Sequence, residues 1–222
     1  MFVFLFLGWQ LWLNDVIVGA EQNMQAVKLG QTFTRQASPL GVPVPVPSAG
    51  FGVPVITAVG APDEKFATVY IPRFGADYVR TVAEGVDTRV ALKSGIGHYP
   101  GTQMPGEIGN FALAAHRTTF GAPFSRIASL ELGDKIYIQT ADGWYIYSFR
   151  SMEYVRPTSV AVTAPVPQQT GIRPADRVLT MTSCNPQLSA VERIVAYSIF
   201  DSWQPLSAGV PDAVKALAEG KV

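Results

Sequence analysis

The only cysteine of the chain, Cys184, follows a β-type run from 178 to 182 and lies where a strand is expected to end. A second β-type run begins at Arg193, a short loop later. A thiolate is a strong nucleophile, and the five N–H donors of an arginine can hold an oxyanion, so this pair suits acyl-transfer chemistry. Two ordinary alternatives remain open. A lone cysteine is often an inert buried thiol, and Arg193 can form a solvated salt bridge with Glu192.

Two histidines occur in the chain, His98 and His116. His116 ends the β-type segment NFALAAH and is followed by the polar turn RTTFG. A histidine at a strand end can serve as a general acid or base, although a hydrogen-bonded surface histidine is the plain alternative. Because Cys184 also ends a strand, we favour the catalytic interpretation for His116. We interpret His98 as structural or as a neighbour of the substrate.

The composition limits the classes of function. Lys plus Arg and Asp plus Glu each number 17 in 222 residues, so no basic surface for nucleic acid is indicated. A single cysteine allows no internal disulfide, and no CxxC or paired Cys/His spacing suggests zinc. The chain is long enough for one domain with extensions.

The N-terminal residues are apolar as far as Leu13 and again from Val16. Such a stretch is shorter than the roughly 20 residues that cross a bilayer, and neither a preceding cation nor a cleavage site suggests a signal peptide. We expect the outer end of a membrane helix, with Trp9 and Trp12 at the interface and the polar run 21–29 as its continuation. The alternative is an amphipathic helix that packs on the domain or on a second copy.

The remaining chain divides into segments that differ in residue composition. Repeated prolines between residues 36 and 62 predict an extended spacer that holds the domain off the membrane or drapes along its surface. Our expected division is an anchor helix at 1–35, the spacer at 36–64, a catalytic domain at 65–205 and a tail at 206–222 with a short helix near 211–220.

Short β-type runs dominate from Phe66 onward and predict an antiparallel barrel or sandwich. A tight hairpin is expected at Ala141–Gly143, and short helices at 87–93 and 122–130. The expected strands are 66–71, 79–83, 111–115, 135–140, 144–155, 178–182 and 193–200.

Several separated motifs resemble the sortases, the membrane-anchored cysteine transpeptidases of Gram-positive bacteria. TMTSC at 180–184, with an arginine shortly after it, is similar to the TLxTC motif of that family, with Met181 in place of Leu and Ser183 in place of Thr. GHYPGT at 97–102, HRTTFGAPF at 116–124 and WQPLSAG at 203–209 resemble class E, the housekeeping type of high-GC actinobacteria.

The resemblance implies an all-β fold, a sortase-like eight-stranded antiparallel β-barrel with short helices, preceded by the N-terminal apolar helix. It implies catalysis by His116, Cys184 and Arg193, with no metal or organic cofactor. Tyr99 resembles a groove tyrosine that favours alanine in the substrate, with half-buried packing as the alternative, and Thr118 and Ser183 are weaker candidates for the groove.

The implied reaction is cleavage of the Thr–Gly bond in an LAxTG or LPxTG sorting signal through a thioester on Cys184. The partners would be secreted surface proteins and a cell-wall precursor amine, with the catalytic domain outside a membrane crossed once. Calcium, which orders a substrate loop in class A, is not expected because Glu107, Asp134 and Glu153 are scattered.

Three alternatives come from other classes. A pilin-specific sortase carries an aromatic lid motif, where this chain has Ala61–Pro62–Asp63. A non-catalytic cell-surface β-domain would hold an unreactive Cys184. An L,D-transpeptidase or a papain-like hydrolase requires SxGC or a cysteine ahead of the histidine, and neither pattern is present.

Overall fold

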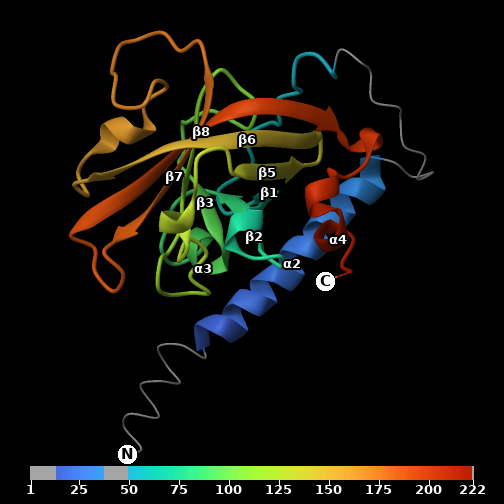
Figure 1. Cartoon of the computed structure of the whole chain (residues 1–222), viewed down its shortest axis with the longest axis horizontal. Helices are drawn as coiled ribbons and strands as arrows, with labels where there is room; N and C mark the ends of the chain where they lie inside the picture. Colours follow the sequence, from blue (N-terminus) through green and yellow to red (C-terminus); the bar gives the residue numbers. More distant parts are fainter. Residues whose placement is uncertain (1–13, 38–49, 222) are drawn as a thin grey trace, which may run out of the picture.

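Eight β-strands close into a barrel in the order β1-β2-β3-β4-β7-β8-β6-β5 (Figure 1). The structure is a computed structural model that describes residues 14–37 and 50–221. The predicted eight-stranded barrel is confirmed. The strands are β1 (Lys65–Tyr70), β2 (Val79–Glu84), β3 (Ile96–His98), β4 (Gly109–Ala114), β5 (Lys135–Thr140), β6 (Gly143–Val155), β7 (Arg177–Asn185) and β8 (Glu192–Pro205).

Two of the seams between neighbouring strands are parallel, whereas we expected an antiparallel barrel. β2 runs parallel to β3, and β4 runs parallel to β7. Both seams join strands whose connection crosses from one end of the barrel to the other, as a parallel pairing requires. The consequence for function is direct, because the C-terminal ends of β4 and β7 meet at the same rim.

The barrel interior is filled by alternate side chains of each strand, as the period of two in a β-strand dictates. On β4 the inward residues are Phe111 and Leu113, and on β7 they are Leu179 and Met181. On β8 Ile194 and Ala196 contribute to the same core. The positions between these residues therefore face outward on all three strands.

The short elements agree less well with those predicted from the sequence. Strand β3 was not predicted, because three residues with a central glycine give no usable alternation. The helix expected at 122–130 is wrong: only the 3₁₀ turn Ile127–Ser129 forms there. Helix α3 (Ala91–Ser94) is shorter than expected, and the tail folds as the 3₁₀ turn Asp212–Val214 followed by α4 (Lys215–Ala218).

Helix α2 (Asn14–Ala37) lies against the outside of the barrel, over β1, β2 and β5 (Figure 1). Its buried side follows a spacing of three and four residues, which is one face of an α-helix. Helix α2 includes the polar run 21–29, which we expected to be helical, and its buried face packs on the barrel. The buried positions are Gly19, Gln22, Ala26, Gly30 and Phe33.

The apolar segment 1–13 lies outside the described residues, and the expectation placed on it stays a prediction. Among residues 14–37 and 50–221, no helix combines the length and the apolar character that a bilayer crossing requires.

The described end of the proline-rich segment lies along the barrel and is hydrogen-bonded to it. The Trp203 indole donates to the Gly52 carbonyl at 3.0 Å, and the Thr57 hydroxyl donates to Asp142 at 2.7 Å. Both contacts lie near the end of β8 and the β5–β6 hairpin. Arg193 is at the opposite end of β8, so this part of the segment does not cover that rim.

Candidate active site

Cys184 and Arg193 lie on β7 and β8, and His116 lies two residues beyond the end of β4, at the same rim of the barrel. Cys184 and Arg193 are direct partners in the antiparallel β7–β8 pair. The parallel β4–β7 pair ends at Ala114 and Thr182, and the Ala115 amide still donates to the Thr182 carbonyl at 3.2 Å. His116 and Cys184 each lie two positions beyond that last pair, His116 in the segment after β4 and Cys184 on β7.

The three side chains also share one face. Leu113, Met181 and Ile194 point into the barrel, so the alternation directs His116, Cys184 and Arg193 outward. Neighbouring strands are about 4.8 Å apart, so this register sets a histidine, a thiol and a guanidinium in one row across the outer surface. A row of this kind needs the parallel seam, because an antiparallel β4 would end at the other rim.

His116 is half-buried and available for proton transfer. Its Nε2 is buried and has no hydrogen-bond partner among the described residues, and its ring packs on Phe120 with centroids 5.0 Å apart. Burial lowers the pKa of His116 below the ordinary value of 6.5, although the charge of Asp15 opposes this shift. The imidazole is therefore mainly neutral near pH 7 and can accept a proton.

Arg117 is a part of the site that the sequence did not reveal. It is 8% exposed, and its Nη1 donates to the Cys184 carbonyl at 3.3 Å and to the Asn185 side chain. The guanidinium therefore fixes the end of β7 and adds a positive charge beside the half-buried Cys184 thiol. Its position directly after His116 was the only signal, and its reach across to β7 depends on the strand pairing.

Arg193 is half-buried and turned toward the β7–β8 loop. Its Nη1 donates to the carbonyls of Ala190 and Glu192 at 3.1 and 3.0 Å. The Glu192 carboxylate instead accepts a hydrogen bond from the Asn185 amide at 3.0 Å. Within the described chain Arg193 forms no salt bridge, and Nε and Nη2 make no hydrogen bond. These two nitrogens are the donors that a developing oxyanion could use.

Tyr99 stands beside the same outer row. Its hydroxyl is 3.0 Å from the Thr182 hydroxyl, and Thr182 is the outward position just before Cys184 on β7. The preceding His98 is completely buried, with Nδ1 2.6 Å from Glu84 and Nε2 2.9 Å from the Thr102 hydroxyl. His98 is thus structural, and its contacts hold the loop that carries Tyr99.

Ser183 and Thr118 lie elsewhere than the sequence suggested. Ser183 is 3% exposed and donates to the Ala115 carbonyl at 2.8 Å, so its hydroxyl joins β7 to the end of β4 instead of lining a groove. Thr118 is half-buried and faces a separate cavity. Ser183 therefore supports the site by joining β7 to the end of β4, whereas Thr118 lines the neighbouring cavity.

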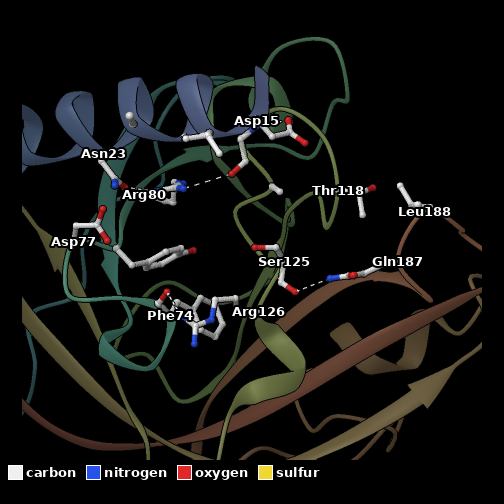
Figure 2. Close-up of a pocket in the computed structure, with 16 residues that line it drawn as sticks. Asp15, Asn23, Phe74, Asp77, Arg80, Thr118, Ser125, Arg126, Gln187 and Leu188 are labelled. Carbon is white, nitrogen blue, oxygen red and sulfur yellow. Dashed lines mark hydrogen bonds between the residues drawn. The ribbon is translucent and has the colours of Figure 1, made fainter. Parts of the chain in front are cut away.

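The cavity that Thr118 faces has a volume of about 540 Å³ and lies between α2 and the chain that follows His116 (Figure 2). Asp15 and Arg80 line it on one side, and Ser125 and Leu188 on the other. A second hollow of about 600 Å³ shares Ser125 with it and includes Arg117. Neither hollow is lined by His116, Cys184 or Arg193, so both lie next to the reactive row and not over it.

The scattered carboxylates have other partners. Asp134 pairs with Arg73 at 2.7 Å, and Glu107 accepts from the Met104 amide at 3.0 Å. Among the residues that the structure describes, no group of three or more His, Cys, Asp or Glu side chains could hold a metal ion. The rim therefore offers a thiol, a neutral imidazole and a guanidinium, which together suit acyl transfer through a thioester.

Comparison with known proteins gives the same indication. Residues 69–199 match the sortase domain family. The chain is 33% identical over 217 residues to sortase SrtE1 of Streptomyces coelicolor, an alignment that covers 95% of this chain and 56% of that protein. The chain thus spans little more than half the length of this relative.

Solved sortase E structures share the fold. The structure of sortase E from Streptomyces avermitilis superposes with a TM-score of 0.63 at 37% identity, covering 70% of this chain and 99% of that one. Sortase E1 from Streptomyces coelicolor, crystallised with a tripeptide in the active site, gives a TM-score of 0.64 at 36% identity over 71% and 99% of the two chains.

Proposed function

The chain belongs to the sortase family and is similar to its class E members, and from this we propose that it is a cysteine transpeptidase acting on sorting signals. The observation that carries the proposal is the register that pairs Cys184 with Arg193 on β7 and β8 and brings His116, just beyond the end of β4, to the same rim. The substrate would be the C-terminal sorting signal of a secreted surface protein, of LAxTG or LPxTG type.

The mechanism follows from the protonation state of His116. The neutral imidazole takes the thiol proton, and the resulting Cys184 thiolate attacks the Thr–Gly carbonyl. Free N–H donors of Arg193 stabilise the tetrahedral oxyanion. The protonated imidazole then gives its proton to the leaving glycine amine, which leaves a thioester on Cys184. A cell-wall precursor amine attacks the thioester and passes its proton to His116, and the Cys184 thiolate leaves as the linked product forms. His116 then returns the proton to Cys184, which restores the thiol and the neutral imidazole.

We also propose a place in the cell. The apolar sequence 1–13 precedes α2, and a membrane anchor there would put the catalytic domain outside the cell, where surface proteins and the precursor amine meet.

The proposal has a direct test. The protein is mixed with an LAxTG or LPxTG peptide and an amine nucleophile, and the products are identified by mass spectrometry. We expect a new amide between threonine and the amine, and slow hydrolysis to the free threonine carboxylate when the amine is omitted. Absence of cleavage of both peptides would contradict the proposal and favour a non-catalytic surface domain.

Arg193 has a predicted effect on the rate. Arg193→Ala removes the oxyanion donors, and loss of such a donor typically lowers kcat by about 10²- to 10³-fold. Arg193→Lys keeps the charge but not the planar fork of donors, so we expect it to restore little of the lost rate. Steady-state kinetics with the peptide measure both. Since Arg150 is exposed and lies outside the row, Arg150→Ala is the control, and equal losses in the two alanine variants would contradict the role.

Tyr99 has a predicted effect on selectivity. Tyr99→Phe removes the hydroxyl beside Thr182 and keeps the ring. We expect the preference between alanine and proline at the second signal position to change by several-fold, because one hydrogen bond contributes about 1 kcal/mol. The ratio of kcat/KM for the two peptides measures this change. If both values fall together and the ratio stays constant, Tyr99 is only a packing residue.

A further inference from the structure

The turn that follows His116 has an unusual backbone. Phe120, Gly121 and Ala122 have φ angles of 52°, 75° and 43°, three successive residues in the left-handed region. That region is unfavourable for residues with a Cβ, and such a run persists only when its surroundings hold it. The question is therefore which contacts hold this turn in place.

The first turns of α2 supply these contacts. The Asp15 carboxylate accepts a hydrogen bond from the Gly121 amide at 3.2 Å. Gln22, which is 4% exposed, donates through Nε2 to the Phe120 carbonyl at 2.9 Å and to the Lys93 carbonyl at 3.1 Å. Figure 2 shows α2 along one side of the cavity, with Asp15 toward the side where Thr118 lies. Two polar side chains of one helix thus bind the backbone of the strained turn.

Beside the cavity, the helix and the turn meet in a close contact at Gly19 and Gly121, where no side chain would fit. A Cβ on Gly121 would lie 3.0 Å from the Gly19 amide nitrogen and 2.8 Å from Gln22 Oε1. At the same contact Arg80, which is buried and bonded to Asn23 of α2, donates to the Gly121 carbonyl at 3.4 Å. The helix and the turn therefore fit together at backbone distance, and a shift in one must move the other.

The turn held by α2 contacts His116. The Phe120 ring packs on the His116 imidazole at 5.0 Å between centroids, and Lys93 Nζ lies 5.6 Å from the Phe120 ring centroid. The Phe124 amide, just beyond the turn, donates to the His116 carbonyl at 3.0 Å. The segment 120–124 therefore contacts both the ring and the backbone carbonyl of His116.

We propose that the first turns of α2 are a positioning element for His116, with Gln22 as the central residue. Gln22 fixes the Phe120 backbone, and the Phe120 ring in turn sets the orientation of the imidazole toward Cys184. Gln22 touches no reacting atom, so it is a positioning residue and not a catalytic one. The inference rests on the proposed catalytic role of His116. It makes the helix that leads out of segment 1–13 a part of the active site.

The test compares two buried glutamines that dock the same helix. Gln22→Ala removes the contact with the turn, whereas Gln139→Ala removes the bonds from Gln139 Nε2 to the Gly30 carbonyl and the Thr34 hydroxyl at the other end of α2. We expect Gln22→Ala to lower kcat by about tenfold with little change in KM, since small misplacements of a catalytic group cost rates of this order. Gln139→Ala should lower the melting temperature and leave kcat within about twofold.

A second measurement does not depend on turnover. The chain has two histidines, and the completely buried His98 is distinct from His116, so NMR can follow each imidazole separately. We expect the His116 resonances to shift in Gln22→Ala and to keep their wild-type positions in Gln139→Ala. If Gln22→Ala does not fold, Gln22→Met, which keeps the length of the side chain and removes both hydrogen bonds, replaces it in both measurements.

The outcomes separate the two proposals. Equal kcat in wild type and Gln22→Ala, or equal losses in Gln22→Ala and Gln139→Ala, would overturn the positioning role. An unchanged His116 spectrum in Gln22→Ala would overturn it as well, even in a protein without transpeptidase activity. Absence of transfer by the wild type would instead overturn the proposed function.

Discussion

Cys184→Ala is expected to reduce acyl transfer to the amine by about 10⁴-fold or more, because removal of a catalytic nucleophile has effects of that order or larger. The physical reason is that no other thiol exists in the chain. Without the thiolate no thioester can form, and the oxyanion donors and the imidazole act only on water. The measurement is the initial rate of Thr–amine product formation, followed by mass spectrometry at saturating peptide.

The control for this variant is its folding. Cys184 is half-buried at the end of β7, and a change to alanine leaves the strand pairing with Arg193 intact. We therefore expect a melting temperature close to that of the wild type. An alanine variant that transfers peptide within about tenfold of the wild-type rate would exclude the thioester route, since general acid–base groups alone do not supply the missing acceleration.

His116→Ala is expected to lower kcat/KM by about 10²- to 10⁴-fold, the usual contribution of a general acid–base residue. His116 both accepts the thiol proton and returns it to the leaving amine in the proposed cycle, so both half-reactions slow down. The matched change is His98→Ala. It removes a completely buried ring bonded to Glu84 at 2.6 Å, and we expect lost stability as its primary defect.

The pH profile distinguishes this role from a structural one. Burial lowers the pKa of His116 below 6.5, so in the wild type the neutral form persists to lower pH than for a free histidine. We expect kcat/KM to fall on the acidic side at a pH below 6.5 as the base becomes protonated. The residual activity of His116→Ala should lack this fall. A profile with the same acidic limb in both proteins would contradict the assignment.

The seven longer strands were predictable because apolar residues alternate along them, and burial of these residues in the barrel core stabilises the strands. β3 was not, since it has three residues and is held by its neighbours on both sides. The parallel β4–β7 seam could not be read from local pattern either. It depends on which strands become neighbours, and each strand has the same appearance in sequence whichever direction its partner runs.

The catalytic candidates were visible because each is a rare residue type at a strand end inside a recognisable motif. A motif does not show where each of its side chains points: the Ser183 hydroxyl donates to the Ala115 carbonyl and does not line a groove. Arg117 and Gln22 act through contacts between segments far apart in the chain, and a single sequence carries no signal for those. The packing of α2 on the barrel was not predictable either, because the apolar residues before it are equally typical of a membrane anchor.

The most direct measurement of the central claim is the intact mass of the protein during reaction with an LAxTG peptide in the absence of an amine. A thioester on Cys184 predicts a species heavier by the peptide acyl fragment that ends in threonine, lost on addition of an amine and absent in Cys184→Ala. Peptide cleavage with no such adduct, or an adduct that persists in Cys184→Ala, would contradict the account.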